Sequence, residues 1–215
     1  MQATPSRPTS PSAPHSRGAP MGAAVTAAAA ATEHVAPAAL PLRPTRWERW
    51  AERDLQWTIL LHRTTQYRVW QALLVTVSRL GDGGFWYALG LWLMYVGGPA
   101  RDTAWKMVAA GVVNLMVYAV LKRVTGRDRP YVHCGDIKAC ARALDTGSFP
   151  SGHTMHAVCF SIIAGTQFPL LGLTLAPFVL LTAVSRVVLG LHYPSDVAAG
   201  ASIGAFMAAV ALMVF

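Results

Sequence analysis

The sequence predicts an all-α protein: a bundle of six membrane-spanning helices, preceded by a helix that lies along the membrane surface. Hydrophobic residues make up 53% of the 215 residues and charged residues only 13%, which is too apolar for an ordinary globular surface. Apolar stretches recur from residue 69 to the end, and turns and one long polar loop separate them. The chain is therefore expected to be an integral membrane protein.

Residues 1–45 are expected to form a disordered tail, and residues 46–215 the membrane domain. The tail is dominated by Pro, Ala, Ser and Thr and has few large apolar side chains. Its run Ala27–Ala31 resembles the core of a signal peptide, but the run lacks Leu and Ile and follows a long polar, proline-rich stretch. A cleaved signal is disfavoured, and Met21 is an alternative start.

The surface helix is expected over Trp47–His62. Large apolar side chains alternate there at helical spacing with charged ones, as in an amphipathic helix at a membrane interface. Two apolar runs follow, Val69–Leu80 and Phe85–Val96, and a Gly-Asp-Gly-Gly turn separates them, so we expect a helical hairpin. Each run is shorter than the roughly 20 residues that a span requires, so flanking residues must extend both helices.

Four further spans are expected. Thr103–Leu121 is the third, and a long polar loop follows it. The stretch Thr154–Ser185 contains no Asp, Glu, Lys or Arg, and Pro169 with Gly172 interrupts it, which favours two spans joined by a tight turn. Val197–Phe215 is the last span. Its small residues Gly200, Gly204 and Ala208 favour ordinary close helix contact over a dimer motif.

Six spans would place both termini on one side of the membrane. Arginines at the end of the tail, with Arg101 and Lys106 after the second span, put the termini in the cytoplasm by the positive-inside rule. The loops after the first, third and fifth spans would then face outward. An inner-membrane protein with its functional site on the periplasmic side is therefore expected.

Three polar blocks lie at the edges of the apolar stretches. They are Lys122-x6-Arg129-Pro130, Pro150-Ser151-Gly152-His153 and Ser185-Arg186-x5-His192-x3-Asp196. In the expected topology the three blocks share one membrane face, where they gather three cations, two histidines and one carboxylate. This set of side chains is suited to cleave a phosphate ester without a metal.

Lys122, Arg129 and Arg186 are the candidate phosphate ligands, because cations near a membrane need an anionic partner and Arg binds phosphate through two parallel hydrogen bonds. Snorkelling to the interface is the alternative for Lys122. Ser151 and Gly152 begin the fourth span, where helix amides point at a bound phosphate and glycine lets the backbone approach it.

His192 and Asp196 are four residues apart, so the carboxylate can reach one imidazole nitrogen and leave the other as a nucleophile. A charge that only favours the helix dipole is the alternative for Asp196. His153 stands at the entrance of an apolar span, where it would face the bound group.

Taken together, the three blocks resemble the type 2 phosphatidic acid phosphatase superfamily of membrane lipid phosphatases, whose fold is shared by soluble vanadium-dependent haloperoxidases. The resemblance covers roughly residues 66–215. It implies a six-helix bundle with His192 as nucleophile, His153 as general acid and Asp196 orienting His192. It also implies phosphate contacts at Lys122, Arg129, Ser151, Gly152 and Arg186. We expect His192 to attack phosphorus, and water then to hydrolyse the phosphohistidine.

The expected substrate is a lipid phosphate or diphosphate in the membrane. Undecaprenyl diphosphate suits the small chain and the outward site, with phosphatidic acid, phosphatidylglycerophosphate and a phosphorylated glycolipid as alternatives. A vanadate-holding haloperoxidase is disfavoured because those relatives are soluble. A lipid phosphate binder or transporter would not need both histidines and Asp196. The net charge of +8 is not arranged as in nucleic-acid-binding proteins, so an anionic lipid partner is expected instead.

No cofactor and no metal are expected, because the acidic residues Asp128, Asp136 and Asp145 are scattered through the loop without compact ligand spacing. Cys134 and Cys140 lie in the same loop and can pair on an oxidising side, whereas a zinc site with His133 matches no common ligand spacing. Cys159 is expected to be a small core residue within a span.

Overall fold

The computed structural model describes residues 45–215, and every regular element in that range is helical, which confirms the all-α fold class. The helices are α1 (Arg46–His62), η1 (Arg63–Gln66, a single 3-10 turn), α2 (Arg68–Gly81), α3 (Gly84–Val96), α4 (Pro99–Thr125), α5 (Pro130–His133), α6 (Gly152–Gln167), α7 (Pro169–Val188) and α8 (Pro194–Val214). Apart from Thr45, the predicted tail lies outside the described residues, as do the candidate signal core and the alternative start at Met21.

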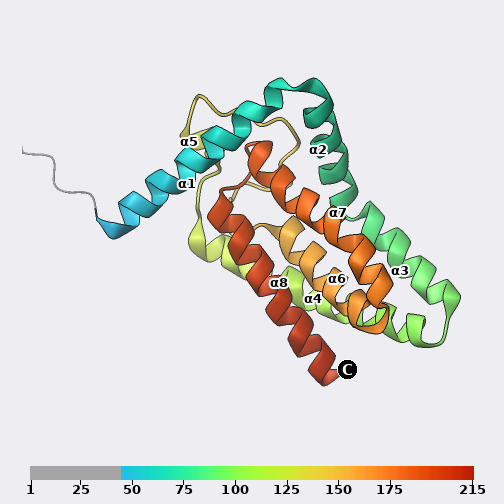
Figure 1. Ribbon diagram of the computed structural model, residues 1–215. Helices are drawn as coiled ribbons and strands as arrows, with labels where there is room; N and C mark the ends of the chain where they lie inside the picture. The colour runs from blue at the N-terminus through green and yellow to red at the C-terminus, as the bar shows by residue number, and fades with distance from the viewer. Residues whose placement is uncertain (1–44) are drawn as a thin grey trace, which may run out of the picture. The chain divides into compact units, whose positions relative to one another are not determined.

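Helix α6 lies at the centre of the bundle, in contact with α4, α7 and α8 (Figure 1). Helix α8 packs against α6 so closely that the backbones of the two helices are in contact. A Cβ atom added at Gly204 would lie 2.3 Å from the carbonyl oxygen of Met155, and one at Gly200 would lie 2.5 Å from that of Ser151. The small residues of the last helix therefore serve close contact within the chain, as the sequence predicts.

Within the described part of the chain, three segments are long and apolar enough to cross a membrane: Pro99–His133, Pro169–Val188 and Pro194–Val214. Large apolar side chains point outward from them, including Leu115, Leu173 and Phe206, which are 58%, 71% and 66% exposed. Exposed apolar side chains on helices of this length are typical of a surface that faces lipid. The protein is an integral membrane protein.

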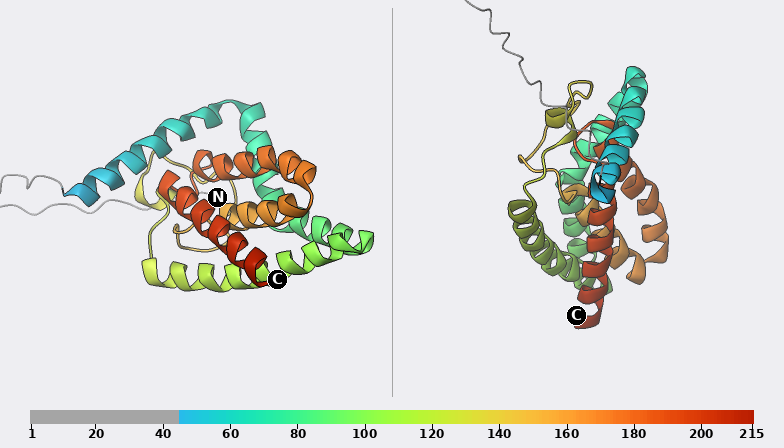
Figure 2. Two further views of the ribbon diagram at one scale, coloured as in Figure 1. Left: turned by 60° about the horizontal axis from the view of Figure 1, so that its bottom comes forward. Right: turned by 90° about the vertical axis from the view of Figure 1, so that its left-hand side faces the viewer.

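The predicted hairpin of α2 and α3 is wrong. The two helices follow one another through the turn at Asp82, and the chain folds back only at Gly97 and Gly98, between α3 and α4 (Figures 1 and 2). Accordingly α2 packs on α7, whereas α3 packs on α4. The turn itself lies beside the beginning of α6, since Asp82 hydrogen-bonds to His153 in the first turn of that helix.

This arrangement changes the topology. The polar blocks lie at the end of the bundle where α4 and α7 end and where α6 and α8 begin, and this end is called the site end below. Helix α1 lies at the site end, since Asp54 contacts Ser195 in the first turn of α8. Phe215 lies at the opposite end of α8 (Figure 1). The expectation that both ends of the membrane domain share one side is therefore wrong.

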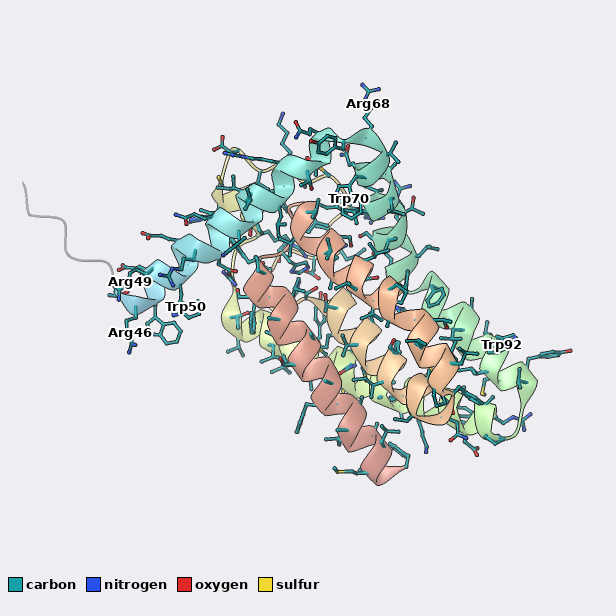
Figure 3. All side chains as sticks on the ribbon, viewed as in Figure 1. Arg46, Arg49, Trp50, Arg68, Trp70 and Trp92 are labelled. Carbon is teal, nitrogen blue, oxygen red and sulfur yellow. The ribbon has the colours of Figure 1, made fainter. Side chains whose placement is uncertain are left out.

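Helix α1 begins with a capping box, in which Thr45 and Glu48 each accept a hydrogen bond from the other's backbone N–H. Its tryptophans at positions 47, 50 and 57 are 84%, 67% and 58% exposed, as in an interfacial helix. Figure 3 shows Trp50 with Arg46 and Arg49 at the beginning of α1.

The C-terminal end of α1 is held against the bundle by His62. Its Nδ1 donates to the carbonyl oxygen of Val188 at 2.8 Å, and its Nε2 accepts from the N–H of Lys138 at 3.2 Å. The buried imidazole thus joins α1 to the end of α7 and to the long loop, which fixes α1 across the site end.

Candidate active site

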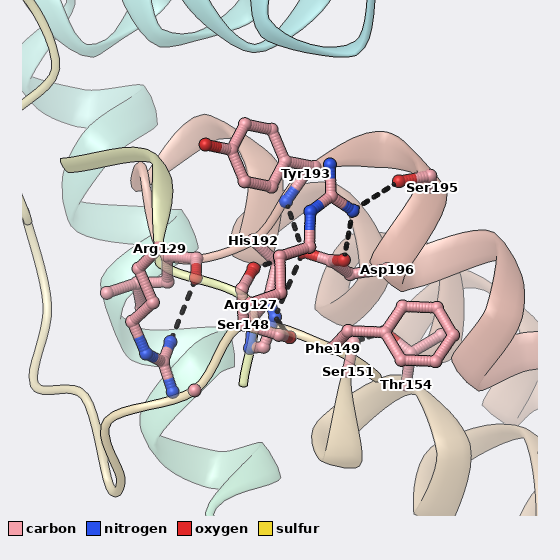
Figure 4. A network of polar contacts seen from close by, with 12 residues as sticks. Arg127, Arg129, Ser148, Phe149, Ser151, Thr154, His192, Tyr193, Ser195 and Asp196 are labelled. Carbon is pink, nitrogen blue, oxygen red and sulfur yellow. Dashed lines mark hydrogen bonds and ion pairs between the residues drawn. The ribbon is translucent and has the colours of Figure 1, made fainter. Parts of the chain in front are cut away.

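The three polar blocks meet at the site end, as the sequence predicts (Figure 4). Arg129 of the first block donates from Nη1 to the carbonyl oxygen of Leu191 in the third, at 2.9 Å. The N–H of Ser151 in the second block donates to the carbonyl oxygen of Asp196 in the third, at 3.0 Å. One hydrogen bond from a side chain to the backbone and one between two backbone groups therefore hold the blocks together.

His192 lies in the short segment between α7 and α8 and is only 2% exposed. Its Nδ1 is 2.6 Å from the carbonyl oxygen of Ser148. A carbonyl oxygen only accepts hydrogen bonds, so Nδ1 carries the hydrogen and Nε2 carries the lone pair. Among the described residues no group hydrogen-bonds to Nε2. The imidazole is thus fixed in the tautomer that a nucleophile requires.

Burial, together with the charges of Arg186 and Arg129, lowers the pKa of His192 to about 3, against the opposing effect of Asp196. Water is excluded from the ring, and two cations disfavour a further positive charge on it. His192 is therefore neutral at physiological pH, with its Nε2 lone pair available.

Asp196 does not orient His192 in the way the sequence suggests. Its Oδ2 is 3.8 Å from Nδ1 of His192, which is beyond hydrogen-bonding distance, because the carbonyl of Ser148 takes that position. The carboxylate instead accepts from the hydroxyl of Ser148 and, at 2.8 Å, from the N–H of Tyr193 at the beginning of α8. Asp196 therefore reaches His192 through Ser148, and it also satisfies a free amide at the helix start.

Arg127 joins this cluster to helix α1, a link that the sequence does not reveal. Its Nη1 lies 2.6 Å from Oδ1 of Asp196, and its Nη2 lies 2.7 Å from Oδ2 of Asp54. The guanidinium also stacks on the Tyr193 ring, with its central carbon 4.0 Å from the ring centroid. The fully buried Asp196 carboxylate is thus neutralised by Arg127, a residue of the first block that is not among the three candidate phosphate ligands.

Two of the three candidate phosphate ligands are bound to a carboxylate of the chain itself. Asp145 in the long loop accepts from Lys122 and, at 2.8 Å, from Nη2 of Arg129. The hydroxyl of Tyr118 donates to the same carboxylate. Although burial opposes ionisation, these hydrogen bonds lower the pKa of Asp145 to about 2. The ionised Asp145 carboxylate therefore occupies the donors of Lys122 and Arg129 that a bound phosphate would use.

Arg186, the third candidate ligand, is 1% exposed and comes from the last turn of α7. Its Nη1 donates to the hydroxyl of Ser78 on α2, and its buried Nε has no hydrogen-bond partner within the described chain. The guanidinium interacts electrostatically with both His153 and His192. A buried guanidinium with an unused donor between two histidines is suited to receive an anion.

Ser151 and Gly152 lie at the beginning of α6, as expected, and each packs closely against a neighbouring side chain. The Ser151 hydroxyl is fully buried and lies 3.0 Å from that of Thr154, and it makes no capping hydrogen bond to α6. A Cβ atom at Gly152 would lie 2.7 Å from the Tyr118 ring. The absence of a side chain at Gly152 therefore makes room for Tyr118.

His153 is in the first turn of α6, and its Nε2 hydrogen-bonds to Asp82 in the turn between α2 and α3. The sequence predicts the position of His153 but not this partner. Ser78, Asp82, Tyr118 and Ser148 are further polar residues of the site that sequence reasoning missed, since each comes from outside the three blocks.

Within residues 45–215, no group of three or more His, Cys, Asp or Glu side chains is close enough to hold a metal ion, and all three cysteines are free thiols. Cys159 is buried, as expected, and Cys134 and Cys140 are half-buried. A cavity of about 980 Å³ between α6, α7 and α8 is apolar and contains none of the candidate site residues. The cavity adjoins the polar cluster at Thr154, whose hydroxyl contacts that of Ser151.

A sequence profile of the PAP2 superfamily matches residues 103–215, which is just over half of the chain and contains all three blocks. A decaprenylphosphoryl-5-phosphoribose phosphatase of Mycobacterium tuberculosis is 37% identical over 118 residues, covering 52% of this chain and 62% of that protein. The undecaprenyl-diphosphatase BcrC of Bacillus subtilis is 33% identical over 113 residues, covering 52% and 58%. The chain thus spans less than two thirds of the length of these relatives.

Among solved structures, the fold resembles that of a transmembrane PAP2 type phosphatidylglycerolphosphate phosphatase from Bacillus subtilis. The TM-score is 0.64 at 20% identity, and the match covers 77% of this chain and 85% of that one. At this identity the likeness shows a shared fold.

Proposed function

The chain belongs to the PAP2 superfamily, and from this premise we propose that it is a membrane lipid phosphatase that works through a phosphohistidine on His192. The observation that carries the proposal is the state of His192: Nδ1 is held by the Ser148 carbonyl, Nε2 has no partner in the described chain, and the ring is neutral. A buried neutral imidazole with one fixed nitrogen is prepared for nucleophilic attack.

In the proposed reaction, Nε2 of His192 attacks phosphorus in line with the departing oxygen, and His153 protonates that oxygen. Arg186 binds the non-bridging oxygens through its unused donor. Lys122 and Arg129 join it once the phosphate displaces Asp145, and the Ser151 hydroxyl and the Gly152 backbone amide contribute at the start of α6. Water then attacks the phosphohistidine, with His153 as base, and releases phosphate.

An isoprenoid phosphate or diphosphate is the favoured substrate class, with undecaprenyl diphosphate as one member. Two relatives are named for polyprenyl substrates, which supports this preference. Phosphatidic acid and phosphatidylglycerophosphate are the alternatives, and the name of the structural neighbour supports the latter. Metal independence is part of the proposal, since Arg and Lys side chains supply the positive charge that a metal would otherwise supply.

The proposal is tested by phosphate release from purified protein in detergent, with chelator present, across undecaprenyl diphosphate, phosphatidic acid, phosphatidylglycerophosphate and lipid A. His192→Ala is the blank. We expect release by the wild type with the highest kcat/KM on an isoprenoid substrate. A protein that binds these lipids but releases no phosphate would instead be a lipid phosphate binder or transporter.

Location in the inner membrane with an outward-facing site stays a prediction. The positive-inside rule, on which it depended, applies differently to the observed fold. Because α1 lies at the site end, its arginines belong to the same side as the site, so the positive-inside rule no longer favours an outward site. The exposed loop residue Ala139, changed to Cys in a chain whose native cysteines are replaced by Ser, decides the matter. Labelling by an impermeant maleimide in intact cells would support the outward site, and labelling only after permeabilisation would contradict it.

A further inference from the structure

The turn between α2 and α3 contains an acidic residue, Asp82, that the reaction described above does not use. Oδ1 of this residue hydrogen-bonds to Nε2 of His153, which is 71 positions away in the sequence. The side chain of His153 is 9% exposed and that of Asp82 is 33% exposed, so the imidazole side of the contact is buried and the carboxylate side is partly open. A carboxylate thus lies directly behind the histidine that is proposed as the general acid.

The glycines of this turn bring Asp82 to the imidazole. Gly83 has a φ of 125°, a conformation that residues with a side chain rarely adopt, and it lets the chain turn sharply after Asp82. A Cβ atom at Gly81 would lie 3.4 Å from Cδ2 of His153, so the backbone lies close against the ring. The Gly-Asp-Gly-Gly sequence therefore serves to place a carboxylate within the bundle, and not to reverse the chain.

The hydrogen bond determines which nitrogen of His153 is left without a partner. An ionised carboxylate only accepts, so Nε2 of His153 carries a hydrogen and donates it to Asp82. The other nitrogen, Nδ1, has no hydrogen-bond partner in the described chain. This is the relation between carboxylate and histidine found in catalytic triads, in which the acid fixes the ring and stabilises the imidazolium.

The charges around His153 explain why such a partner is needed. Burial, and then the charges of Arg186 on α7 and His156 on α6, disfavour a positive charge on the ring, and Asp82 is the group that favours it. Asp82 itself is also near Arg142 of the long loop. Without a carboxylate at this place, a general acid next to Arg186 would lose its proton at lower pH.

We propose that Asp82 is a positioning residue for the leaving-group step, holding His153 through Nε2 and stabilising its protonated form so that Nδ1 donates to the departing oxygen. The proposal rests on the phosphatase function proposed above. The bond from phosphorus to the leaving oxygen breaks while the bond to Nε2 of His192 forms, and the proton on Nδ1 of His153 moves to the leaving oxygen. In the second step the neutral Nδ1 takes a proton from the attacking water, which restores the imidazolium beside Asp82.

The test compares Asp82→Asn with Asp82→Glu and with the control Asp102→Asn, which removes the same charge at the exposed far end of the bundle. Each variant is assayed on an alkyl lipid phosphate and on an aryl phosphate with a good leaving group. Protonation of the departing oxygen matters for the alkyl ester and little for the aryl ester. For Asp82→Asn we expect a fall in kcat of roughly 10²-fold on the alkyl ester, within the usual range for general acid catalysis, and much less on the aryl ester.

Two further readouts separate positioning from a structural role. In Asp82→Asn the alkaline limb of the pH profile of kcat should move to lower pH with KM nearly unchanged, and Asp82→Glu should restore part of the rate. Equal losses on both esters with an unshifted pH profile would overturn the proposal, as would a variant that behaves like Asp102→Asn. A wild-type protein without phosphatase activity would overturn the proposed function itself, so the two failures are distinguishable.

Discussion

The carbonyl oxygen of Ser148 lies 2.6 Å from Nδ1 of His192, in the position that a triad would give to a carboxylate. The side chain of the same serine donates to Asp196. Ser148 therefore accepts a hydrogen bond from His192 with its backbone carbonyl, and its hydroxyl donates a hydrogen bond to the buried Asp196 carboxylate. Orientation of the nucleophile depends on the loop before α6 as much as on the acid four residues later in the sequence.

Replacing Ser148 with Ala should lower kcat by roughly tenfold and leave KM nearly unchanged, because the carbonyl that holds His192 loses its anchor on Asp196 and a hydrogen bond to a charged group is lost. Steady-state kinetics on a lipid phosphate check this. Ser195→Ala is the matched control, since Ser195 contacts Asp54 and Arg127 at the surface and does not reach His192. Equal effects of the two changes would contradict the anchoring role.

Replacing Asp145 with Asn should strengthen product inhibition. The carboxylate occupies donors of Lys122 and Arg129, so its removal frees both for phosphate, and we expect the inhibition constant of inorganic phosphate to fall by roughly tenfold. Inhibition of phosphate-ester cleavage by inorganic phosphate provides the measurement. Asp136→Asn is the control, as Asp136 is an exposed acid of the same loop. Weaker inhibition in the Asp145 variant than in the control would show that the carboxylate supports the phosphate site instead of occupying it.

His192 should stay neutral between pH 5 and pH 8, since burial and the nearby arginines lower its pKa to about 3. An unfolded histidine has a pKa of about 6.5, so below that pH the unfolded chain binds a proton that the folded chain does not. His192 should therefore decrease the stability of the fold progressively from about pH 6.5 down to about pH 3. Histidine nitrogen NMR of the protein in detergent checks the charge state, with His192→Ala for assignment. A His192 signal that titrates near pH 6 would refute the buried neutral state.

Replacing Gly152 with Ala should lower the Tm by several degrees, because the added Cβ would lie 2.7 Å from the Tyr118 ring and force α6 and α4 apart. Gly84→Ala is the control, since a Cβ atom there meets nothing within 4 Å. Thermal unfolding in detergent compares them. The further change Tyr118→Ala in the Gly152→Ala chain should restore part of the lost Tm, and no recovery would point to a cause other than the Tyr118 contact.

Much of the fold and of the site follows from sequence pattern. Apolar runs and their breaks predict the helices, and the spacing of charged residues at their edges predicts the convergence of the three blocks at one end. The two short runs around Asp82 predict a hairpin, since a glycine-rich turn commonly reverses a chain, but the turn instead brings Asp82 to His153.

The sequence pattern does not predict which side chains contact one another within the site. Asp145 and Asp82 are ordinary acidic residues of a loop and a turn when the sequence is considered alone, and only the tertiary fold brings them to Lys122 and His153. The same is true of Arg127, whose contacts with Asp54 and Asp196 join residues 73 and 69 positions apart. Short sequence spacing predicts contacts within one helix, whereas these contacts arise from how the helix ends are assembled.

The central claim is that His192 becomes phosphorylated, and trapping the intermediate tests it most directly. Purified protein is mixed with a radiolabelled lipid phosphate, quenched in base, which preserves phosphohistidine, and digested for peptide analysis. If His192 is the nucleophile, label is expected on the peptide that contains His192, and none in His192→Ala. Full hydrolysis by the His192→Ala protein, or label on any other residue, would show that His192 is not the nucleophile.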